Sequence, residues 1–585
     1  MLVVFDKLKD NFISAKESHQ NLLICLTIVL VSLVCFSNNL TGKFIYDDYL
    51  VVVDNTSIKS LNNIPNLFLQ SYFGKDNNAG TYRPLTTVSF AINYAISGLE
   101  PYGYHLVNII IHTINSLLIY CIVKHYSESK LLSMFTALLF SVHPVHSEAV
   151  AAIYGRPELL ATMFLLLSWV YYLKSPINKY YYFISLLSYF LSLLCKESGI
   201  VFFGILLLVQ FCTKTSWKER LLPEIKTWGY VAITVPYLIV RTLVTGAFGV
   251  PKTGQILGNE SFLTRFYTMS FGYVKYFQML VWPSKFYIEY DFSVIPKITS
   301  MNYTVALSLL LVLLVVVVGF WQASKNRIVA FGILFFFVTT SVVSNVFLPT
   351  GILISERTIY LAVGSICLII GAAFYKVYKM GWTKLALVFF IFTLLLASTR
   401  TYYRNLDFQN DEVLFSSTLK ISPNHFKANY SLGLYYENIG QIDKAEVYLK
   451  KALQLNENSS IANVALGNFY NKQRKVDLAI SLFKKAILLD QNNADAHNFY
   501  GAILLSQNNL CEAKEHLTKA IAINKSLVKA HNNLGVTFAQ MNNYKEAKRE
   551  FEKTLELDPT YQGAKENLNL LKKLEQNSNP PINCP

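Results

Sequence analysis

Long apolar stretches alternate with short polar segments over the first 400 residues of the chain. A stretch of roughly 17–25 apolar residues is long enough to cross a bilayer as a helix. The pattern therefore predicts an all-α, polytopic membrane domain over residues 1–400, with about eleven spans. The predicted spans are residues 21–38, 104–123, 131–149, 157–173, 180–195, 198–213, 227–246, 302–324, 328–348, 357–375 and 382–400.

Two further features bear on this count. Residues 264–283 are apolar but contain Lys275, Gln278 and several tyrosines, a composition that favours an interfacial or re-entrant helix over a span. The first span follows three lysines, and no small-residue cleavage site comes after it. It is therefore predicted to be retained as a span and not removed as a signal peptide.

Basic residues indicate which ends of the spans face the cytoplasm. With eleven spans and the N-terminus inside, most Lys and Arg of the short loops fall on the cytoplasmic side, as the positive-inside rule requires. If residues 264–283 crossed, the last two basic loops would lie outside. The pattern therefore predicts an exoplasmic C-terminal region, with the long loops 39–103 and 247–301 on the same outer face.

Beyond residue 401 the chain becomes polar and repeats every 34 residues. Such a period is typical of tetratricopeptide (TPR) helical hairpins, in which small residues let two helices approach closely. The repeating positions are Gly433, Gly467, Gly501 and Gly535, then Ala445, Ala479, Ala513 and Ala547, then Ala452, Ala486, Ala520 and Thr554. The predicted organisation is a linker and partial repeat (401–425), four TPR repeats in an α-solenoid (426–561), and a capping helix with a disordered tail (562–585).

Composition agrees with a membrane protein. Apolar residues make up 53% of the chain and charged residues 15%, which excludes a wholly soluble protein. Residues 1–400 carry 30 Lys and Arg against 18 Asp and Glu, which leaves 22 against 19 for the rest. The basic excess thus belongs to the apolar part and indicates membrane topology, not nucleic-acid binding. The eight cysteines include no C-x-x-C pair, so neither a disulfide framework nor a zinc site is predicted.

Charged residues near span ends gather on the predicted outer face. Such residues are costly in a membrane, at about 2.5–3.5 kcal/mol each on insertion scales. Together they suit an anionic substrate headgroup, such as a lipid phosphate, beside an acid or base. They are Asp47 and Asp48 (IYDDY), Arg83 (TYRPLTT), His143, His146, Glu148, Arg156 and Glu158 (HPVHSEAVAAIYGRPE), Lys196 and Glu197 (CKESG), Arg241, Glu289 and Asp291 (IEYD), and Glu356 and Arg357 (SERTIY).

Each of these groups has a plainer interpretation. Asp47 and Asp48 alone read as a solvated loop pair, and the five basic residues as interfacial side chains or ion-pair partners of nearby glutamates. His143 and His146 are interpreted as hydrogen-bonded positioning residues, with acid–base chemistry or a metal as alternatives. No Walker A, G-x-S-x-G or G-x-G-x-x-G pattern supports nucleotide-driven or serine-hydrolase chemistry.

Several segments together resemble the transmembrane and TPR family of protein O-mannosyltransferases. They are IYDDY, YRPLTTVSFAINY, GYHLVNIIIHTINSLLIY, LFSVHPVHSEAVAAIYGRPELLA, CKESGI, SNVF with SERTIYL, and the repeats after RNLDF. The resemblance implies a C-type glycosyltransferase (GT-C) fold and transfer of a sugar, mannose in that family, from a dolichyl- or polyprenyl-phosphate donor to Ser/Thr hydroxyls. It implies a base at Asp47 or Asp48, cations that stabilise the lipid phosphate, and a TPR domain that engages a polypeptide acceptor.

The alternatives stay open at this stage. The acidic pair could bind a divalent metal, although a metal-independent reaction is favoured because no third ligand is identified. The chain could instead be a non-catalytic membrane scaffold whose repeats recruit proteins. The predicted location is the plasma membrane of a prokaryote or the endoplasmic reticulum of a eukaryote, with the TPR domain exoplasmic.

Overall fold

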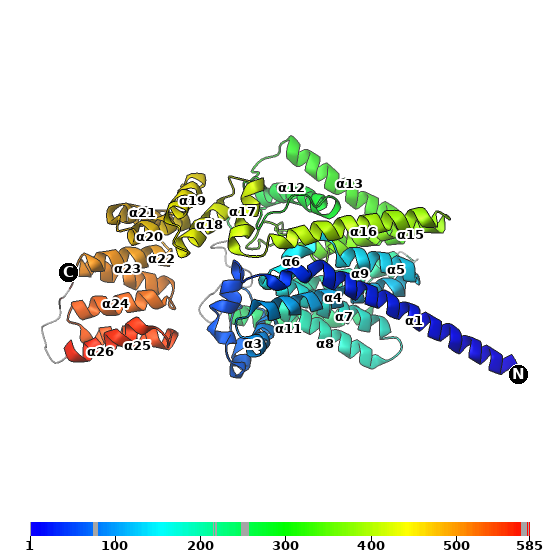
Figure 1. Cartoon of the computed structure of the whole chain (residues 1–585), viewed down its shortest axis with the longest axis horizontal. Helices are drawn as coiled ribbons and strands as arrows, with labels where there is room; N and C mark the ends of the chain where they lie inside the picture. The colour runs from blue at the N-terminus through cyan, green and yellow to red at the C-terminus, as the bar shows by residue number, and fades with distance from the viewer. Residues whose placement is uncertain are drawn as a thin grey trace. The chain divides into compact units, whose positions relative to one another are not determined.

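The computed structural model describes residues 2–73, 80–214, 216, 219–220, 222–246, 257–574, 582 and 584. The chain forms two compact units, Met1–Ile421 and Ser422–Pro585. Within the described residues both units consist of helices and irregular segments with no β-strand, which confirms the all-α fold class (Figure 1). The domain boundaries expected from the sequence stay predictions.

The first unit is a bundle of long helices joined by short helical turns (Figure 1). In it α7 packs against α4 and α8, and α15 packs against α5 and α14. Its α-helices are α1 (Leu2–Phe36), α2 (Ile64–Leu67), α3 (Pro84–Ser97), α4 (Pro101–Ser127), α5 (Lys130–Ser141), α6 (Ser147–Ala151), α7 (Arg156–Lys174), α8 (Lys179–Cys195), α9 (Val201–Thr213), α11 (Ile225–Thr245), α12 (Phe262–Val281), α13 (Tyr303–Lys325), α14 (Arg327–Thr340), α15 (Val363–Lys379), α16 (Thr383–Leu406) and α17 (Asp411–Ile421).

Among the described residues, five helical segments are long and apolar enough to cross a membrane by themselves. A bent pair of helices raises the number to six if it forms one span. The predicted spans 131–149, 198–213 and 328–348 overlap shorter apolar helices, and 180–195 and 357–375 overlap α8 and α15. The count of eleven and the role of residues 264–283, which overlap α12, stay predictions. The five segments are His19–Thr41, Pro101–Ser127, Ile225–Thr245, Tyr303–Lys325 and Thr383–Leu406.

The stretch predicted as a span at residues 131–149 is divided in the structure. The helix α5 ends at Ser141, and a short 3-10 helix, η5 (Pro144–His146), leads into α6. The segments Pro144–Ala151 and Ile153–Lys174 meet at 104°. Since proline has no backbone N–H and a fixed φ, Pro144 begins a new helical turn instead of continuing α5. The break brings the polar residues of this region into one folded segment.

The second unit consists of paired antiparallel helices with the predicted 34-residue repeat (Figure 1). In each pair, the first helix crosses the second at a glycine. A Cβ at Gly433 would meet the Leu449 side chain at 2.6 Å, and one at Gly467 would meet Phe483 at 2.8 Å. The helices are α18 (Phe426–Asn438), α19 (Ile442–Leu455), α20 (Ser460–Lys472), α21 (Val476–Leu489), α22 (Ala494–Ser506), α23 (Leu510–Ile523), α24 (Val528–Gln540), α25 (Tyr544–Leu557) and α26 (Gln562–Leu574).

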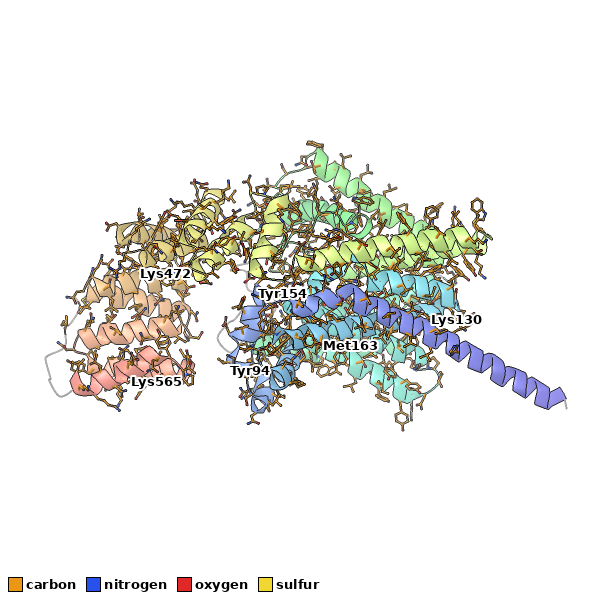
Figure 2. The ribbon with its side chains drawn as sticks, in the orientation of Figure 1. Tyr94, Lys130, Tyr154, Met163, Lys472 and Lys565 are labelled. Carbon is orange, nitrogen blue, oxygen red and sulfur yellow. A yellow bond between two sulfur atoms is a disulfide. The ribbon has the colours of Figure 1, made fainter. Side chains whose placement is uncertain are left out.

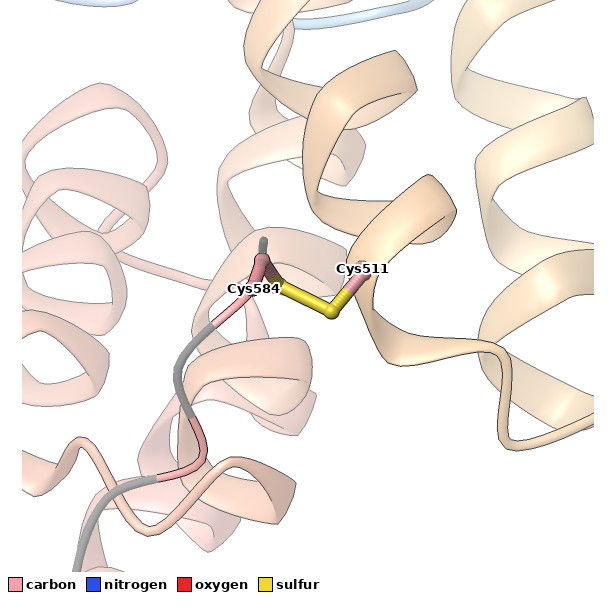
Figure 3. The surroundings of a disulfide bond; sticks show 2 residues. All are labelled: Cys511 and Cys584. Carbon is pink, nitrogen blue, oxygen red and sulfur yellow. A yellow bond between two sulfur atoms is a disulfide. The ribbon is translucent and has the colours of Figure 1, made fainter.

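A disulfide joins Cys511 in α23 to Cys584 near the C-terminus (Figure 3). The expectation that the cysteines form no disulfide is therefore wrong for this pair. Cysteine spacing could not reveal it, because the two residues are 73 positions apart and only the fold brings them together. Beside the bond, the Ile582 N–H donates to the Met541 carbonyl at 2.8 Å. Most of the tail predicted to be disordered lies outside the described residues.

Candidate active site

The loop after α1 is held in an uncommon backbone conformation at Tyr46. Its φ is +47°, in the left-handed region that a bulky residue rarely adopts, at a cost of about 1–3 kcal/mol. Two hydrogen bonds fix it: the backbone N–H donates to Asp411 at 2.8 Å, and the phenol hydroxyl donates to Glu289 at 2.5 Å. The strained residue directly precedes the acidic pair and determines the direction in which each carboxylate points.

Asp48 is fully buried and acts as an anchor for this loop. Its Oδ2 accepts a hydrogen bond from the Ile45 N–H at 3.1 Å, and its Oδ1 accepts one from the Tyr154 N–H at 2.7 Å. Tyr154 lies in the 3-10 turn η6 (Ile153–Gly155) between α6 and α7 and is labelled in Figure 2. Burial raises the pKa of Asp48 well above its ordinary value, and the two backbone donors offset only part of this effect.

Asp47 points to a different environment and keeps 28% of its side chain exposed. Its Oδ2 lies 3.9 Å from the guanidinium of Arg357, which starts the 3-10 turn η9 (Arg357–Ile359). The same guanidinium lies 3.6 Å from Glu148 Oε1, and the Arg357 N–H donates to Glu148 Oε2 at 3.0 Å. Arg357 is therefore positioned by Glu148 from α6 and faces Asp47 from the first loop.

A second group of ion pairs lies at the ends of α3, α7 and α8. Arg83 forms a two-pronged pair with Glu197, at 3.0 and 3.3 Å. Lys196, the neighbour of Glu197, pairs with Glu158 in the first turn of α7, and both side chains are more than nine-tenths buried. Such fixed cations lose little conformational freedom when an anion binds.

The two groups of charges meet around one small cavity. Its lining includes Glu158 and Lys196 from the second group and Arg357 from the first. The buried side chain of Tyr72 lies among the same charges, because Arg83, Glu158, Asp47 and Arg357 all act electrostatically on it. The structure thus brings together eight sequence-predicted residues: Asp47, Asp48, Arg83, Glu148, Glu158, Lys196, Glu197 and Arg357.

Apolar cavities continue from this charged end through the bundle. Leu361 lines both the charged cavity and an adjoining one formed by α4, α7, α14 and α15. That second cavity shares Trp169, Phe331 and Leu368 with a third, which has a volume of about 250 Å³ and reaches Thr213 and Arg327. Cavities with shared walls thus follow the bundle from the charged residues to the opposite helix ends.

Other predicted site residues have structural partners. Arg156 is completely buried and donates to Asn108, Asn93 and the carbonyls of Tyr104 and Ser89, so its guanidinium joins α3, α4 and α7. Arg241 in α11 donates to the Gly80 carbonyl at 2.7 Å.

The two histidines pack in the interior. A ring nitrogen of His143 lies 3.2 Å from the Leu280 carbonyl, and the other ring nitrogen accepts from the Val145 N–H. A ring nitrogen of His146 lies 3.2 Å from the Tyr360 carbonyl, and the ring packs at a tilt against those of Phe140 and Tyr360. These contacts fit hydrogen-bonded positioning, one of the three interpretations of this pair.

Sequence reasoning missed Arg404, which organises the end of α16. Its guanidinium holds Glu356 at 2.6 and 3.4 Å and Asp407 at 2.9 Å, and the Arg404–Glu356 pair is fully buried. The sequence feature that could have revealed it is the position of Arg404, four residues after Arg400 and immediately beyond the last predicted span. Glu356 is thereby engaged on α16, whereas its neighbour Arg357 faces the cavity.

No group of three or more His, Cys, Asp or Glu side chains that could hold a metal ion occurs within the described ranges. Both carboxylate oxygens of Asp48 are occupied by backbone donors. A cation at the acidic pair would therefore depend on Asp47.

Comparison with protein families identifies TPR repeats in the second unit. Tetratricopeptide-repeat family models match residues 439–503 and 528–561. Among solved structures, the chain is similar to that of PilF from Pseudomonas aeruginosa, at 30% sequence identity. The match covers 26% of this chain and 69% of the PilF chain, with a TM-score of 0.25. It also matches a MamA crystal structure at 24% identity over 30% of this chain and 87% of that one, with a TM-score of 0.22.

Curated relatives match both the membrane and the repeat regions. The chain is 29% identical to protein O-mannosyl-transferase F38B6.6 of Caenorhabditis elegans, over 74% of this chain and 62% of the relative. It is 27% identical to protein O-mannosyl-transferase TMTC3 of Mus musculus, over 72% of this chain and 50% of the relative. It is also 27% identical to protein O-mannosyl-transferase TMTC4 of Homo sapiens, over 70% of this chain and 63% of the relative. The resemblance to this family is confirmed, and the chain spans half to about five-eighths of the length of these relatives.

Proposed function

We propose that the chain is a membrane glycosyltransferase that moves a sugar, mannose by analogy with its relatives, from a polyprenyl- or dolichyl-phosphate donor to Ser or Thr hydroxyls of polypeptides. The observation that carries the proposal is the placement of Asp47. Its partly exposed carboxylate lies 3.9 Å from the guanidinium of Arg357, which lines the charged cavity together with Lys196, and apolar cavities continue from that end. The names of the curated relatives support the reaction class.

Asp47 is the proposed general base. A hydroxyl is a weak nucleophile until its proton has an acceptor, and a positioned carboxylate supplies one. The acceptor oxygen forms a bond to the anomeric carbon while the bond from that carbon to the donor phosphate breaks. The proton passes to Asp47, the lipid phosphate leaves with the electron pair, and the anomeric centre inverts.

Arg357, Arg83 and Lys196 are the proposed stabilisers of the leaving phosphate. Each is already fixed by a carboxylate, Arg357 by Glu148, Arg83 by Glu197 and Lys196 by Glu158. Cations that are positioned before the reaction stabilise developing charge without reorganising. Asp48 has a different proposed role, because its oxygens hold the loop in place.

This distinction also supports a metal-independent reaction. A hard divalent cation prefers several oxygen ligands. Both carboxylate oxygens of Asp48 accept backbone hydrogen bonds, and the Asp47 carboxylate lies 3.9 Å from the Arg357 guanidinium, so the acidic pair does not present several uncommitted oxygens to a cation.

A lipid-linked donor fits this series of adjoining cavities. Leu361 lies in the wall between the charged cavity and an apolar one, and we propose that an isoprenoid chain occupies the apolar side while its phosphate contacts Arg357 or Lys196. A ligand with a charged head and an apolar tail matches a site that is charged at one end and apolar at the other.

The proposed location of the reaction is the exoplasmic face. The basic short loops favour this orientation, and the Cys511–Cys584 disulfide supports it because such bonds persist mainly in oxidising compartments. TPR repeats mediate protein–protein interactions, so the second unit is proposed to engage the polypeptide acceptor.

The test is transfer of radiolabelled mannose from polyprenyl-phosphate mannose to protein in membranes that contain the wild-type chain. Asp47→Asn should lower transfer by at least about 100-fold, the contribution of a general base. Asp54→Asn, which changes an exposed carboxylate of the same loop, should leave transfer unchanged. If the wild type transfers no sugar from a panel of lipid-linked donors, the proposal is wrong and the membrane scaffold becomes the preferred function.

A further inference from the structure

Two buried tyrosines beside arginines of the site have hydroxyls that no described protein atom satisfies. Tyr72 is 4% exposed and Tyr154 is 5% exposed. Within the part of the chain that the structure describes, neither phenol oxygen has a hydrogen-bond partner. Burying a hydroxyl without a partner costs about 1–3 kcal/mol, so each such group needs a physical explanation.

Each of these rings lies against an arginine of the site. The Arg83 guanidinium lies 5.2 Å from the ring centre of Tyr72, and the Arg357 guanidinium lies 4.5 Å from that of Tyr154. Cation–π contacts of this kind favour a defined position of the ring relative to the cation. The backbones are fixed as well, since the Tyr72 N–H donates to the Thr81 carbonyl and the Tyr154 N–H donates to Asp48.

Both hydroxyls lie within the field of the same charges. Asp47 and Arg357 act electrostatically on each of them. Glu158 and Arg83 also act on Tyr72, and Glu148 acts on Tyr154. Two fixed phenols, two fixed guanidiniums and the proposed base therefore lie near one another, beside the charged cavity that Arg357 lines. A ligand there needs many oxygen atoms and at least one negative charge.

From this arrangement we infer that Tyr72 and Tyr154 hydrogen bond to the glycosyl phosphate part of the donor, through their otherwise unsatisfied hydroxyls. The inference rests on the proposed function and adds a specific donor-binding role to it. The phenols donate to phosphate oxygens, or exchange hydrogen bonds with sugar hydroxyls, beside the arginines that neutralise the charge.

The experiment compares steady-state kinetics of wild type, Tyr72→Phe and Tyr154→Phe in detergent-solubilised full-length protein. Phenylalanine keeps the ring on its arginine and removes only the hydroxyl. Loss of a hydrogen bond to a charged group should lower kcat/KM for the lipid-linked sugar on the order of 10-fold or more. The KM for an acceptor peptide should stay unchanged, and the melting temperature should not fall, because the hydroxyls that are removed have no partner among the described residues.

A matched control is Tyr189→Phe, which removes the 2.6 Å hydrogen bond between Tyr189 and Thr234 in the interior of the bundle. This variant should lose stability without a change in donor KM. Inhibition by polyprenyl phosphate, which lacks the sugar, identifies the contacted atoms: a weaker inhibitor in the phenylalanine variants indicates the phosphate, and equal inhibition indicates the sugar.

Unchanged donor kinetics in both phenylalanine variants, with an active wild type, would overturn the inference and leave the proposed function intact. An effect confined to melting temperature would do the same, because it would show a structural role. An inactive wild type would instead refute the proposed function.

Discussion

The backbone N–H of Tyr154 donates a 2.7 Å hydrogen bond to the carboxylate of Asp48, 106 residues earlier in the chain. This bond fixes the first loop to the break between α6 and α7. It places Asp47 opposite Arg357 and the Tyr154 ring beneath the same arginine. Adjacent aspartates thus differ in their contacts, because the Asp48 carboxylate accepts backbone hydrogen bonds and the Asp47 carboxylate faces Arg357.

Asp48→Ala should destabilise the first unit, since it leaves the buried N–H groups of Ile45 and Tyr154 without an acceptor. Each unsatisfied donor costs about 1–3 kcal/mol. The melting temperature in detergent should fall, and Asp47→Ala should change it little. Equal melting temperatures for the two variants would contradict the division of roles.

Because burial raises the pKa of Asp48, the folded state favours its protonated form, and stability from this group declines as the pH rises through that pKa.

Arg404→Met should be strongly destabilising, by about 3–5 kcal/mol, because Glu356 would remain buried as an uncompensated charge. Adding Glu356→Leu should recover much of the loss, since an apolar pair can replace a buried ion pair. Unfolding of the single and double variants measures the coupling. Asp407→Asn is the milder control, because Asp407 is 29% exposed. Additive losses in the double variant would argue against the pairing.

Gly364→Leu should weaken binding of a lipid-linked donor by filling the apolar cavity that Gly364 lines. A Cβ at this position meets only Phe335 and Ile119, at 3.8 and 3.9 Å. Gly364→Ala should therefore be tolerated, whereas leucine extends into the space. The readout is the KM for donors with long and short isoprenoid chains, and only the long chain should be affected. Equal effects on both would place the lipid elsewhere.

Stability of the repeats should depend on pH through His531. Burial alone would lower its pKa, but the 2.6 Å hydrogen bond to Glu550, the hydrogen bond to the Lys525 carbonyl and the charge of Glu550 together outweigh burial and raise the pKa above 6.5. The stabilisation is therefore complete below pH 6.5 and is lost as the pH rises through the folded pKa. Urea unfolding of fragment 422–585 should show this loss, and His531→Gln should abolish it. His497, whose pKa burial lowers, should contribute the opposite slope below pH 6.5.

The disulfide should be present in the protein in its native membrane. Unreduced protein should protect Cys511 and Cys584 from maleimide, and both should react after reduction. Cys584→Ser should destabilise the repeats by roughly 2–4 kcal/mol, because the bond closes a long loop. Cys511→Ser should have the same effect. Free thiols at both positions before reduction would contradict the exoplasmic location of this unit.

The helical repeats were predictable because their determinants are local and periodic. Gly433 and its equivalents occur every 34 residues, and the side chains they meet repeat with them. The apolar stretches likewise correspond to helices, since a run of apolar residues needs no distant partner to be recognised. The division of residues 131–149 was missed because its cause, a single proline among polar residues, is weak beside the apolar content around it.

The site was only partly predictable. Charge against an apolar background identified Asp47, Arg83, Glu148 and Arg357, but the roles of adjacent aspartates depend on contacts made more than 100 residues away. Arg156 had the same sequence signal, yet its partners are neutral amides and carbonyls. Tyr72 and Tyr154 carry no charge, and tyrosine is abundant in this chain, so only burial and missing partners distinguish them.

The link between Cys511 and Cys584 changes the mechanics of the repeat array. A stack of helical hairpins normally frays from its last unit, because each hairpin contacts only its neighbours. Here the chain beyond α26 returns and is bonded to α23, so α24, α25 and α26 lie within a covalent ring. The last hairpins cannot peel away one at a time without stretching that ring. The end of the array should therefore resist proteases and pulling forces as one cooperative block.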